Sequence, residues 1–267
     1  MLRDAVEMLA GTIGERNVTR PRAYAAAADF IERSLPNASR QIFESGVNIE
    51  CEVAGNNEIV VIGAHYDSVI GSPGADDNAT GVAAIIELAT RFRKTKRTMR
   101  FVAFANEEPP HFGTPAMGSL RYAQRCKERE ENVVAMLSLE SIGYFSDQPK
   151  SQTYPAMLEL LYPSTGNFVA FVSNLKSASV TRRCRRAFKN FPSEIGTLPE
   201  IVPGVGWSDQ WAFWQCGYKA LMVTDTAPFR NPHYHSAHDT PETIDYARLA
   251  RVVDGLAGVI GELANGK

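Results

Sequence analysis

The chain has 267 residues, of which 44% are hydrophobic and 22% charged, and its formal net charge is −2. This length suits one large α/β domain or two small ones, and the composition is that of a globular protein rather than a disordered one. The near-neutral charge gives no reason to expect nucleic acid as a partner, and no window reaches the ~18 apolar residues of a membrane span.

The first predicted element, residues 2–14, places apolar side chains at helical spacing with acidic residues between them. This pattern is typical of an amphipathic helix and not of a signal peptide. We therefore expect a cytoplasmic protein if the sequence is complete, and a periplasmic or secreted one if a targeting segment was removed. The oligomeric state is left open.

Further along the chain, predicted helices and strands alternate. Helices are expected at 22–35, 80–94, 117–129, 177–189, 208–217 and 246–264. Strands are expected at 47–53, 59–64, 99–105, 133–139, 168–173 and 219–225. Several of these strands are apolar on both faces, which indicates a mostly parallel, mixed sheet covered by helices on both sides. We predict a three-layer αβα sandwich that forms a single domain over residues 1–267.

The four cysteines are far apart and form no CxxC pair, so we expect free thiols rather than disulfides or a cysteine zinc site. They are Cys51, Cys126, Cys184 and Cys216.

Polar side chains of the metal-binding type follow the apolar strands. They are His65 and Asp67, Asp76 and Asp77, Glu107 and Glu108, Glu140, and finally Asp225, His233, His235 and His238. In a sheet of this kind the ligand site lies beyond the carboxyl ends of the strands. Histidine mixed with carboxylates suits zinc or a similar divalent ion, whereas an all-oxygen set would suit magnesium or calcium. Two ions that share one bridging carboxylate would account for five ligands.

The adjacent pair Glu107 and Glu108 fits such a site because successive residues that leave a strand point in different directions. One glutamate could bind metal while the other takes a proton from the activated water. Each signal has a plain alternative. A Glu-Glu pair is usually solvated, an HxD sequence often makes a local hydrogen bond, and "GADDNATG" could be a turn with a helix cap.

Taken in order, the motifs resemble those of the M28-type zinc aminopeptidases (the leucyl aminopeptidase and glutamate carboxypeptidase superfamily). The matching segments are "GAHYDSV", "GADDNATG", "FANEEPP", "LESIGYF", "SDQWAFW" and "NPHYHSAHDTPETIDY", which span roughly residues 58 to 246. The resemblance implies the zinc-peptidase (phosphorylase/hydrolase-like) architecture. It also implies an aminopeptidase that hydrolyses N-terminal peptide bonds of peptide or aminoacyl substrates.

The resemblance assigns two zinc ions per chain to five ligands: His65, Asp77, Glu108, Glu140 and His235. Asp77 would bridge the ions, Glu140 would join His65 on the first, and Glu108 would join His235 on the second. Many members have aspartate at the position of Glu140, so the longer side chain puts the metal preference in question.

The resemblance also assigns roles around the ligands. Glu107 would be the general base that activates the metal-bridging water. Asp67 would hydrogen-bond His65 and orient it. Asp76 would be structural, and a cis peptide would follow Asp77, as it does in relatives.

One departure concerns Gln210, where many members have histidine after Ser-Asp. A glutamine cannot titrate near neutrality, and we expect it to affect substrate contacts rather than metal binding.

Three rival interpretations stay open. A glutaminyl cyclase-like acyltransferase would use one zinc, but it typically differs at "DDNATG" and has tryptophan where Tyr234 stands. A non-catalytic relative would have lost ligands, and all are present here. A carboxypeptidase would need a cation for the substrate carboxylate, for which Arg230 is the nearest candidate in sequence.

Overall fold

The computed structural model describes residues 1–155 and 158–266. Its strands all belong to one eight-stranded sheet, ordered β1-β2-β4-β3-β5-β8-β6-β7. The strands are β1 (Ser39–Phe43), β2 (Gly46–Val53), β3 (Asn56–His65), β4 (Arg97–Phe104), β5 (Asn132–Glu140), β6 (Val169–Ser173), β7 (Ser193–Thr197) and β8 (Ala220–Thr224).

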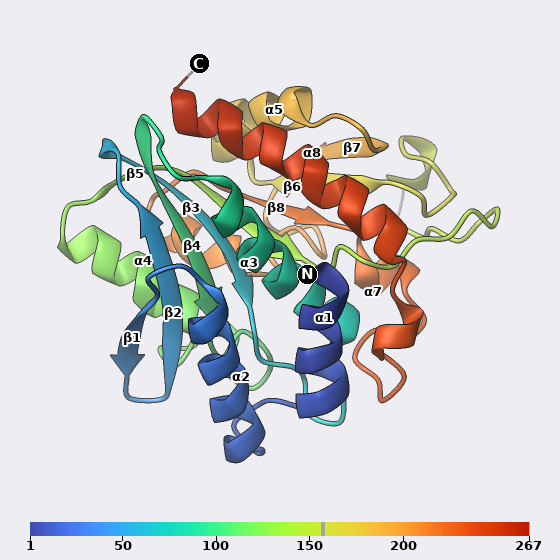
Figure 1. The fold of residues 1–267 in the computed structure, drawn as a ribbon. Coiled ribbons are helices and arrows are strands. Elements are labelled where there is room, and N and C mark those ends of the chain that lie inside the picture. The colour runs from blue at the N-terminus through green and yellow to red at the C-terminus, as the bar shows by residue number, and fades with distance from the viewer. Residues whose placement is uncertain (156–157, 267) are drawn as a thin grey trace.

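Helices cover both faces of this sheet (Figure 1). The α-helices are α1 (Leu2–Val6), α2 (Pro21–Ser34), α3 (Gly81–Arg91), α4 (Gly118–Glu128), α5 (Ala178–Ala187), α6 (Gln210–Gln215), α7 (Ala227–Arg230) and α8 (Tyr246–Asn265). Two π-helical segments, η1 (Glu7–Ile13) and η2 (Ala75–Thr80), precede α2 and α3, and short 3₁₀ turns lie at Leu158–Leu160, Leu175–Ser177 and Pro241–Thr243. The predicted α/β sandwich is confirmed.

The central strands show why both layers are needed. In β3, Val60 and Ile62 face the core formed with α1, α2, α3, α5 and α8. Ile59 and Val61 face the opposite core, formed with α4 and α6. Because a strand directs successive side chains to opposite faces, a strand buried on both sides is apolar throughout.

The sheet is mixed, as expected. The pairs β3–β4, β3–β5, β5–β8 and β6–β7 are parallel. The pairs β1–β2, β2–β4 and β6–β8 are antiparallel. The parallel strands β3, β4, β5 and β8 therefore end at one edge, and their carboxyl ends bring distant segments together.

Two edge elements differ from the sequence prediction. Residues 39–43 and 193–197 lie outside the predicted strands, but they form the strands β1 and β7. All four cysteines are free, as predicted. Within the described residues, no helix is both long and apolar enough to span a lipid bilayer.

Candidate metal centre

Five predicted ligands meet at the carboxyl edge of the sheet. His65 and Glu140 are the last residues of β3 and β5, and Asp77 lies in η2. Glu108 follows β4, and His235 lies in the loop after α7. Their donor atoms fall into groups in which all atoms lie within 4.8 Å of one another.

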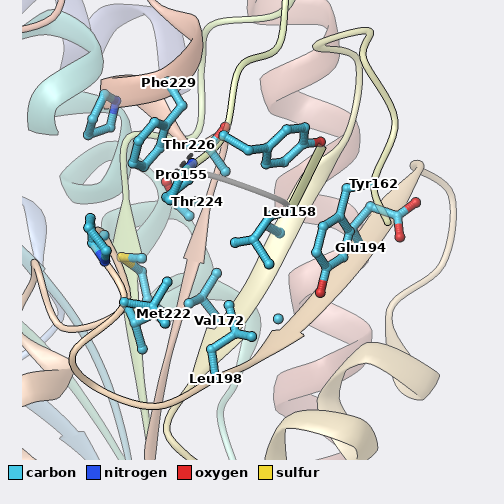
Figure 2. A pocket seen from close by; sticks show the side chains of 18 of the residues that line it. Pro155, Leu158, Tyr162, Val172, Glu194, Leu198, Met222, Thr224, Thr226 and Phe229 are labelled. Carbon is cyan, nitrogen blue, oxygen red and sulfur yellow. Dashed lines mark hydrogen bonds between the residues drawn. The ribbon is translucent and has the colours of Figure 1, made fainter. Parts of the chain in front are cut away.

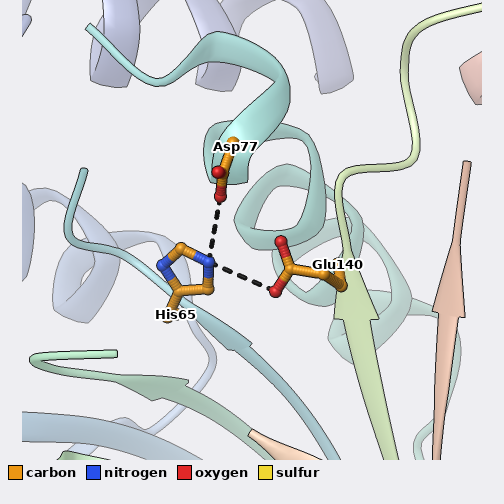
Figure 3. A group of neighbouring side chains, drawn as sticks. All are labelled: His65, Asp77 and Glu140. Carbon is orange, nitrogen blue, oxygen red and sulfur yellow. Dashed lines mark ion pairs between the residues drawn. The ribbon is translucent and has the colours of Figure 1, made fainter. Parts of the chain in front are cut away.

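Asp77 stands between the two histidines. Its Oδ1 is 3.2 Å from His65 Nε2, and its Oδ2 is 3.1 Å from His235 Nε2. Glu140 Oε2 approaches His65 Nε2 at 3.3 Å, which closes the first group, drawn in Figure 3. Glu108 Oε2 approaches His235 Nε2 at 3.3 Å, which closes the second. The arrangement is two donor groups that share one carboxylate.

The first group is more deeply buried than the second. His65 is 0% exposed, and its Nε2 has no hydrogen-bond partner among the described residues. The side chain of His235 is 31% exposed. A buried donor atom without a partner is costly unless something else satisfies it.

The crowding of carboxylates at the site also indicates a place for a cation. Burial and the nearby charge of Asp77 raise the pKa of Glu108 to about 7. Burial also raises the pKa of Glu107 well above its usual value, with Glu140 adding repulsion. Burial opposes the charged form of His235, but Asp77 and Glu108 outweigh it and raise its pKa to about 10. A cation placed among these carboxylates would offset their mutual repulsion, so the residues fit a divalent metal of the zinc type.

Asp67 organises the two glutamates. Its carboxylate accepts the main-chain N–H groups of Glu107 at 3.1 Å and Glu108 at 3.0 Å. His65 Nδ1 lies 3.2 Å from the carbonyl oxygen of Asp67 and 3.5 Å from its Oδ1. The hydrogen-bond partner of His65 Nδ1 is thus the main-chain oxygen of Asp67, whereas the carboxylate binds the backbone that follows β4.

The turn before Asp77 requires glycine. Gly74 has φ +60, and a Cβ at this position would lie 2.3 Å from the carbonyl oxygen of Asp77. The peptide bond between Asp77 and Asn78 is cis, as expected. Asp76 is buried, and its carboxylate accepts N–H groups from Gly143 and Asn231 at 2.9 and 2.8 Å, which is a structural role.

Sequence reasoning missed the contacts of Asp239 and Ser208. The carboxylate of Asp239 accepts the main-chain N–H groups of Asp76 and Asp77, so it joins the His235 loop to η2. The hydroxyl of Ser208 donates to Glu140 Oε2 at 2.6 Å. Both residues lie inside motifs that match the M28 family, but their partners come from distant segments.

No sequence motif indicated a role for Arg16. It is 0% exposed, and among the described residues all acceptors of its guanidinium are main-chain carbonyl oxygens. The acceptors are Leu9, Gly14, Tyr66, Pro73 and Gly74. Burial lowers its pKa to about 10, with Asp239 and Asp67 opposing, so the group stays charged at neutral pH. Arg16 thus ties the N-terminal segment to the loop between His65 and Asp77.

Replacing Arg16 with methionine is expected to destabilise the protein by about 3 kcal/mol or more, because several buried carbonyl oxygens lose their donor. Urea unfolding followed by circular dichroism measures the effect. Arg16→Lys keeps the charge, so its stability should fall between those of the parent and of Arg16→Met. Arg22→Met, at an exposed position on α2, is the matched control and should stay within about 0.5 kcal/mol of the parent. Equal stability of Arg16→Met and the parent would contradict the structural role.

Gln210 was expected to affect substrate contacts, and Arg230 was the candidate cation for a substrate carboxylate. Gln210 is 0% exposed, and its amide donates to the carbonyl oxygen of Val205 at 3.0 Å. The side chain therefore holds the loop around Val205 from inside the protein, and its effect on substrate contacts stays a prediction. Arg230 is also buried and donates to Gln152 Oε1 at 2.7 Å and to the carbonyl oxygen of Phe168 at 2.8 Å.

Comparisons with known proteins identify relatives of this chain. The sequence profile of Peptidase family M28 matches residues 48–260. The chain is 33% identical to the uncharacterized protein YfbL of Escherichia coli (strain K12), over 96% of this chain and 85% of that protein. It is 25% identical to a probable leucine aminopeptidase of Arthroderma otae, over 81% of this chain and 56% of that protein.

Solved structures share the fold. BSAP, a zinc aminopeptidase from Bacillus subtilis, is 25% identical with a TM-score of 0.63, over 83% of this chain and 51% of that one. A glutaminyl cyclase from Fimbriiglobus ruber is 18% identical with a TM-score of 0.68, over 97% of this chain and 93% of that one. The chain thus spans about half the length of BSAP and of the leucine aminopeptidase.

Proposed function

Because the chain belongs to peptidase family M28, we propose that it is a two-zinc aminopeptidase that hydrolyses the N-terminal peptide bond of its substrates. One observation carries the proposal. Asp77 directs one oxygen toward each of two histidines, and each histidine has its own glutamate. The resemblance to BSAP and to leucine aminopeptidases supports the same class of reaction.

The chain offers three donors to each ion. His65, Glu140 and one oxygen of Asp77 would hold the first, and His235, Glu108 and the other oxygen of Asp77 would hold the second. When bound, zinc lowers the pKa of a coordinated water toward 7 and polarises the substrate carbonyl.

Glu107 is a further carboxylate at the site, and one of its oxygens lies within 4.8 Å of donor atoms of His65 and Glu108. Its Oε2 lies 3.8 Å from His65 Nε2, and its side chain is 9% exposed. The contact of its main-chain N–H with Asp67 fixes where the side chain leaves the backbone. We assign Glu107 as the general base, which takes a proton from the attacking water and returns it to the leaving amine.

Metal removal tests the proposal. Dialysis against a chelator should abolish hydrolysis of leucinamide, and added zinc should restore it, with two zinc ions per chain by elemental analysis. N-acetyl-leucinamide, in which the free amine is blocked, is the control substrate and should not be cleaved. Activity that survives complete metal removal would contradict the proposal.

Zinc content together with the reaction product also distinguishes the proposed aminopeptidase from a glutaminyl cyclase-like enzyme. A glutaminyl cyclase-like enzyme would use one zinc and would cyclise N-terminal glutamine instead of releasing it. The glutaminyl cyclase structure supports this alternative only at the level of the fold. Cyclisation of an N-terminal glutamine by protein with one zinc per chain, without hydrolysis of leucinamide, would favour it.

The carboxypeptidase alternative lacks support from Arg230. The nitrogens Nε and Nη1 of Arg230 are engaged with Gln152 and Phe168, and the guanidinium lies over the ring of Phe168 at 4.6 Å. Arg230 is also not among the residues that line the pocket beside Glu140.

A further inference from the structure

An apolar pocket opens directly beside the metal centre (Figure 2). Glu140 lines it at one end together with Tyr234, whose ring stacks on His235 with centroids 3.8 Å apart. The pocket is open to solvent on one side, and most of its lining residues are apolar or aromatic. A group held in it would lie next to the atoms that the proposed reaction uses.

The floor of the pocket is a row of paired strand residues. Glu140 pairs with Thr224 across β5 and β8, and Thr224 pairs with Ala170 across β8 and β6. Paired residues direct their side chains to the same face of a sheet, and neighbouring strands are about 4.8 Å apart. Ala170 therefore lies about 10 Å from Glu140 along this row.

Two small residues leave the floor open. Ala170 offers only a methyl group, and Gly196 on β7 offers none. A Cβ built at Gly196 would lie 3.8 Å from Leu198 Cδ1 and 3.9 Å from both Tyr162 Oη and Val172 Cγ2, which are ordinary contact distances. A larger side chain at either position would take up space in the pocket. At Gly196 its Cβ would fit without a clash.

The walls are aromatic. Tyr154 and Tyr162 stack with centroids 5.7 Å apart, and Trp207 and Phe229 stack at 6.5 Å. The tyrosine hydroxyls are already engaged, because Tyr154 donates to the carbonyl oxygen of Pro163 at 2.6 Å and Tyr162 to that of Ile195 at 2.9 Å. Walls built largely of aromatic rings favour an aromatic guest.

Charge in the pocket is confined to its two sides. Apart from Glu140, Glu194 is the one charged lining residue in the part of the chain that the structure describes. Figure 2 places Glu194 beside Tyr162, on the side of the pocket away from Met222. The space between them is bounded by uncharged side chains, including Leu158 and Val172.

We propose that this pocket receives the side chain of the substrate's N-terminal residue and selects large aromatic side chains, because Ala170 and Gly196 leave its floor open. The inference rests on the aminopeptidase function proposed above. It adds the substrate class, namely peptides that begin with phenylalanine, tyrosine or tryptophan.

The test measures kcat/KM of the zinc-loaded protein on the amides of alanine, leucine, phenylalanine, tryptophan and lysine. The parent should prefer phenylalaninamide to alaninamide by at least about tenfold, the size of discrimination that a few methylene-sized contacts give. In Ala170→Leu and in Gly196→Leu this ratio should fall at least about tenfold. Ala26→Leu, the same exchange as at Ala170 but on the exposed side of α2, should leave the ratio as it is in the parent.

The outcomes distinguish failure of the proposed function from failure of the pocket inference. Failure of the parent to cleave any aminoacyl amide contradicts the proposed function itself. Cleavage with an unchanged ratio in both pocket variants overturns only the pocket inference, as does a preference for lysinamide, which would point to Glu194. Gly196→Leu keeps the test decisive if Ala170→Leu does not fold, and circular dichroism melting identifies that case.

Discussion

Replacement of Glu107 by glutamine is expected to lower kcat by about 10²- to 10⁴-fold, the usual contribution of a general base, and to leave zinc content unchanged. Glutamine has nearly the same shape as glutamate but cannot accept a proton from water. The main-chain contact of residue 107 with Asp67 does not involve the side chain and should persist. Steady-state kinetics with leucinamide and elemental analysis of the same sample measure both parts.

Glu108→Gln is the matched control, because it makes the same chemical change one residue away. Glu108 approaches His235 at 3.3 Å and is assigned as a ligand, so this variant should lose zinc as well as activity. Near-normal activity of Glu107→Gln, or equal zinc loss in the two variants, would refute the assignment of Glu107 as base.

The second large effect is expected at Asp77. Its two oxygens face different histidines, so Asp77→Asn removes negative charge from both donor groups at once. Zinc affinity should fall by more than about 100-fold at both positions, which exceeds the 10- to 100-fold typical of losing a partner that only orients a ligand. Competition with a chromogenic chelator measures both affinities.

Asp76→Asn provides the comparison for that experiment. Asp76 is buried one residue earlier, and its carboxylate binds Gly143 and Asn231 instead of facing the histidines. This variant should unfold at lower urea concentration and still bind two zinc ions. Retention of two tightly bound ions by Asp77→Asn would contradict the bridging role.

The central part of the fold was predictable because burial leaves a clear pattern. Strand β3 is apolar at consecutive positions from Ile59 to Ile62, and it lies between two cores. The edge strands β1 and β7 have the sequences SRQIF and SEIGT, and their side chains are largely exposed or half-buried. Hydrogen bonding to a neighbouring strand holds them in place, and composition alone carries no such signal.

The site shows the same division. His65, Glu108 and Glu140 could be predicted because strand ends that carry metal-type side chains meet at one edge of a parallel sheet. The contacts of Arg16 and Asp239 could not, because their partners are main-chain atoms of loops far away in sequence. Any residue type can supply a main-chain atom, so the partner leaves no mark in the sequence.

The row Glu140–Thr224–Ala170 sets the distance between the reacting atoms and the floor of the pocket by sheet hydrogen bonding. The loops that supply Tyr154 and Val202, and the short helix α7 that supplies Phe229, form the walls. Loop grafting could therefore redesign the walls for other guests while the spacing to the catalytic machinery stays constant. By the same geometry, an inhibitor that carries a metal-chelating head and an aromatic tail needs a linker matched to two strand spacings, about 10 Å.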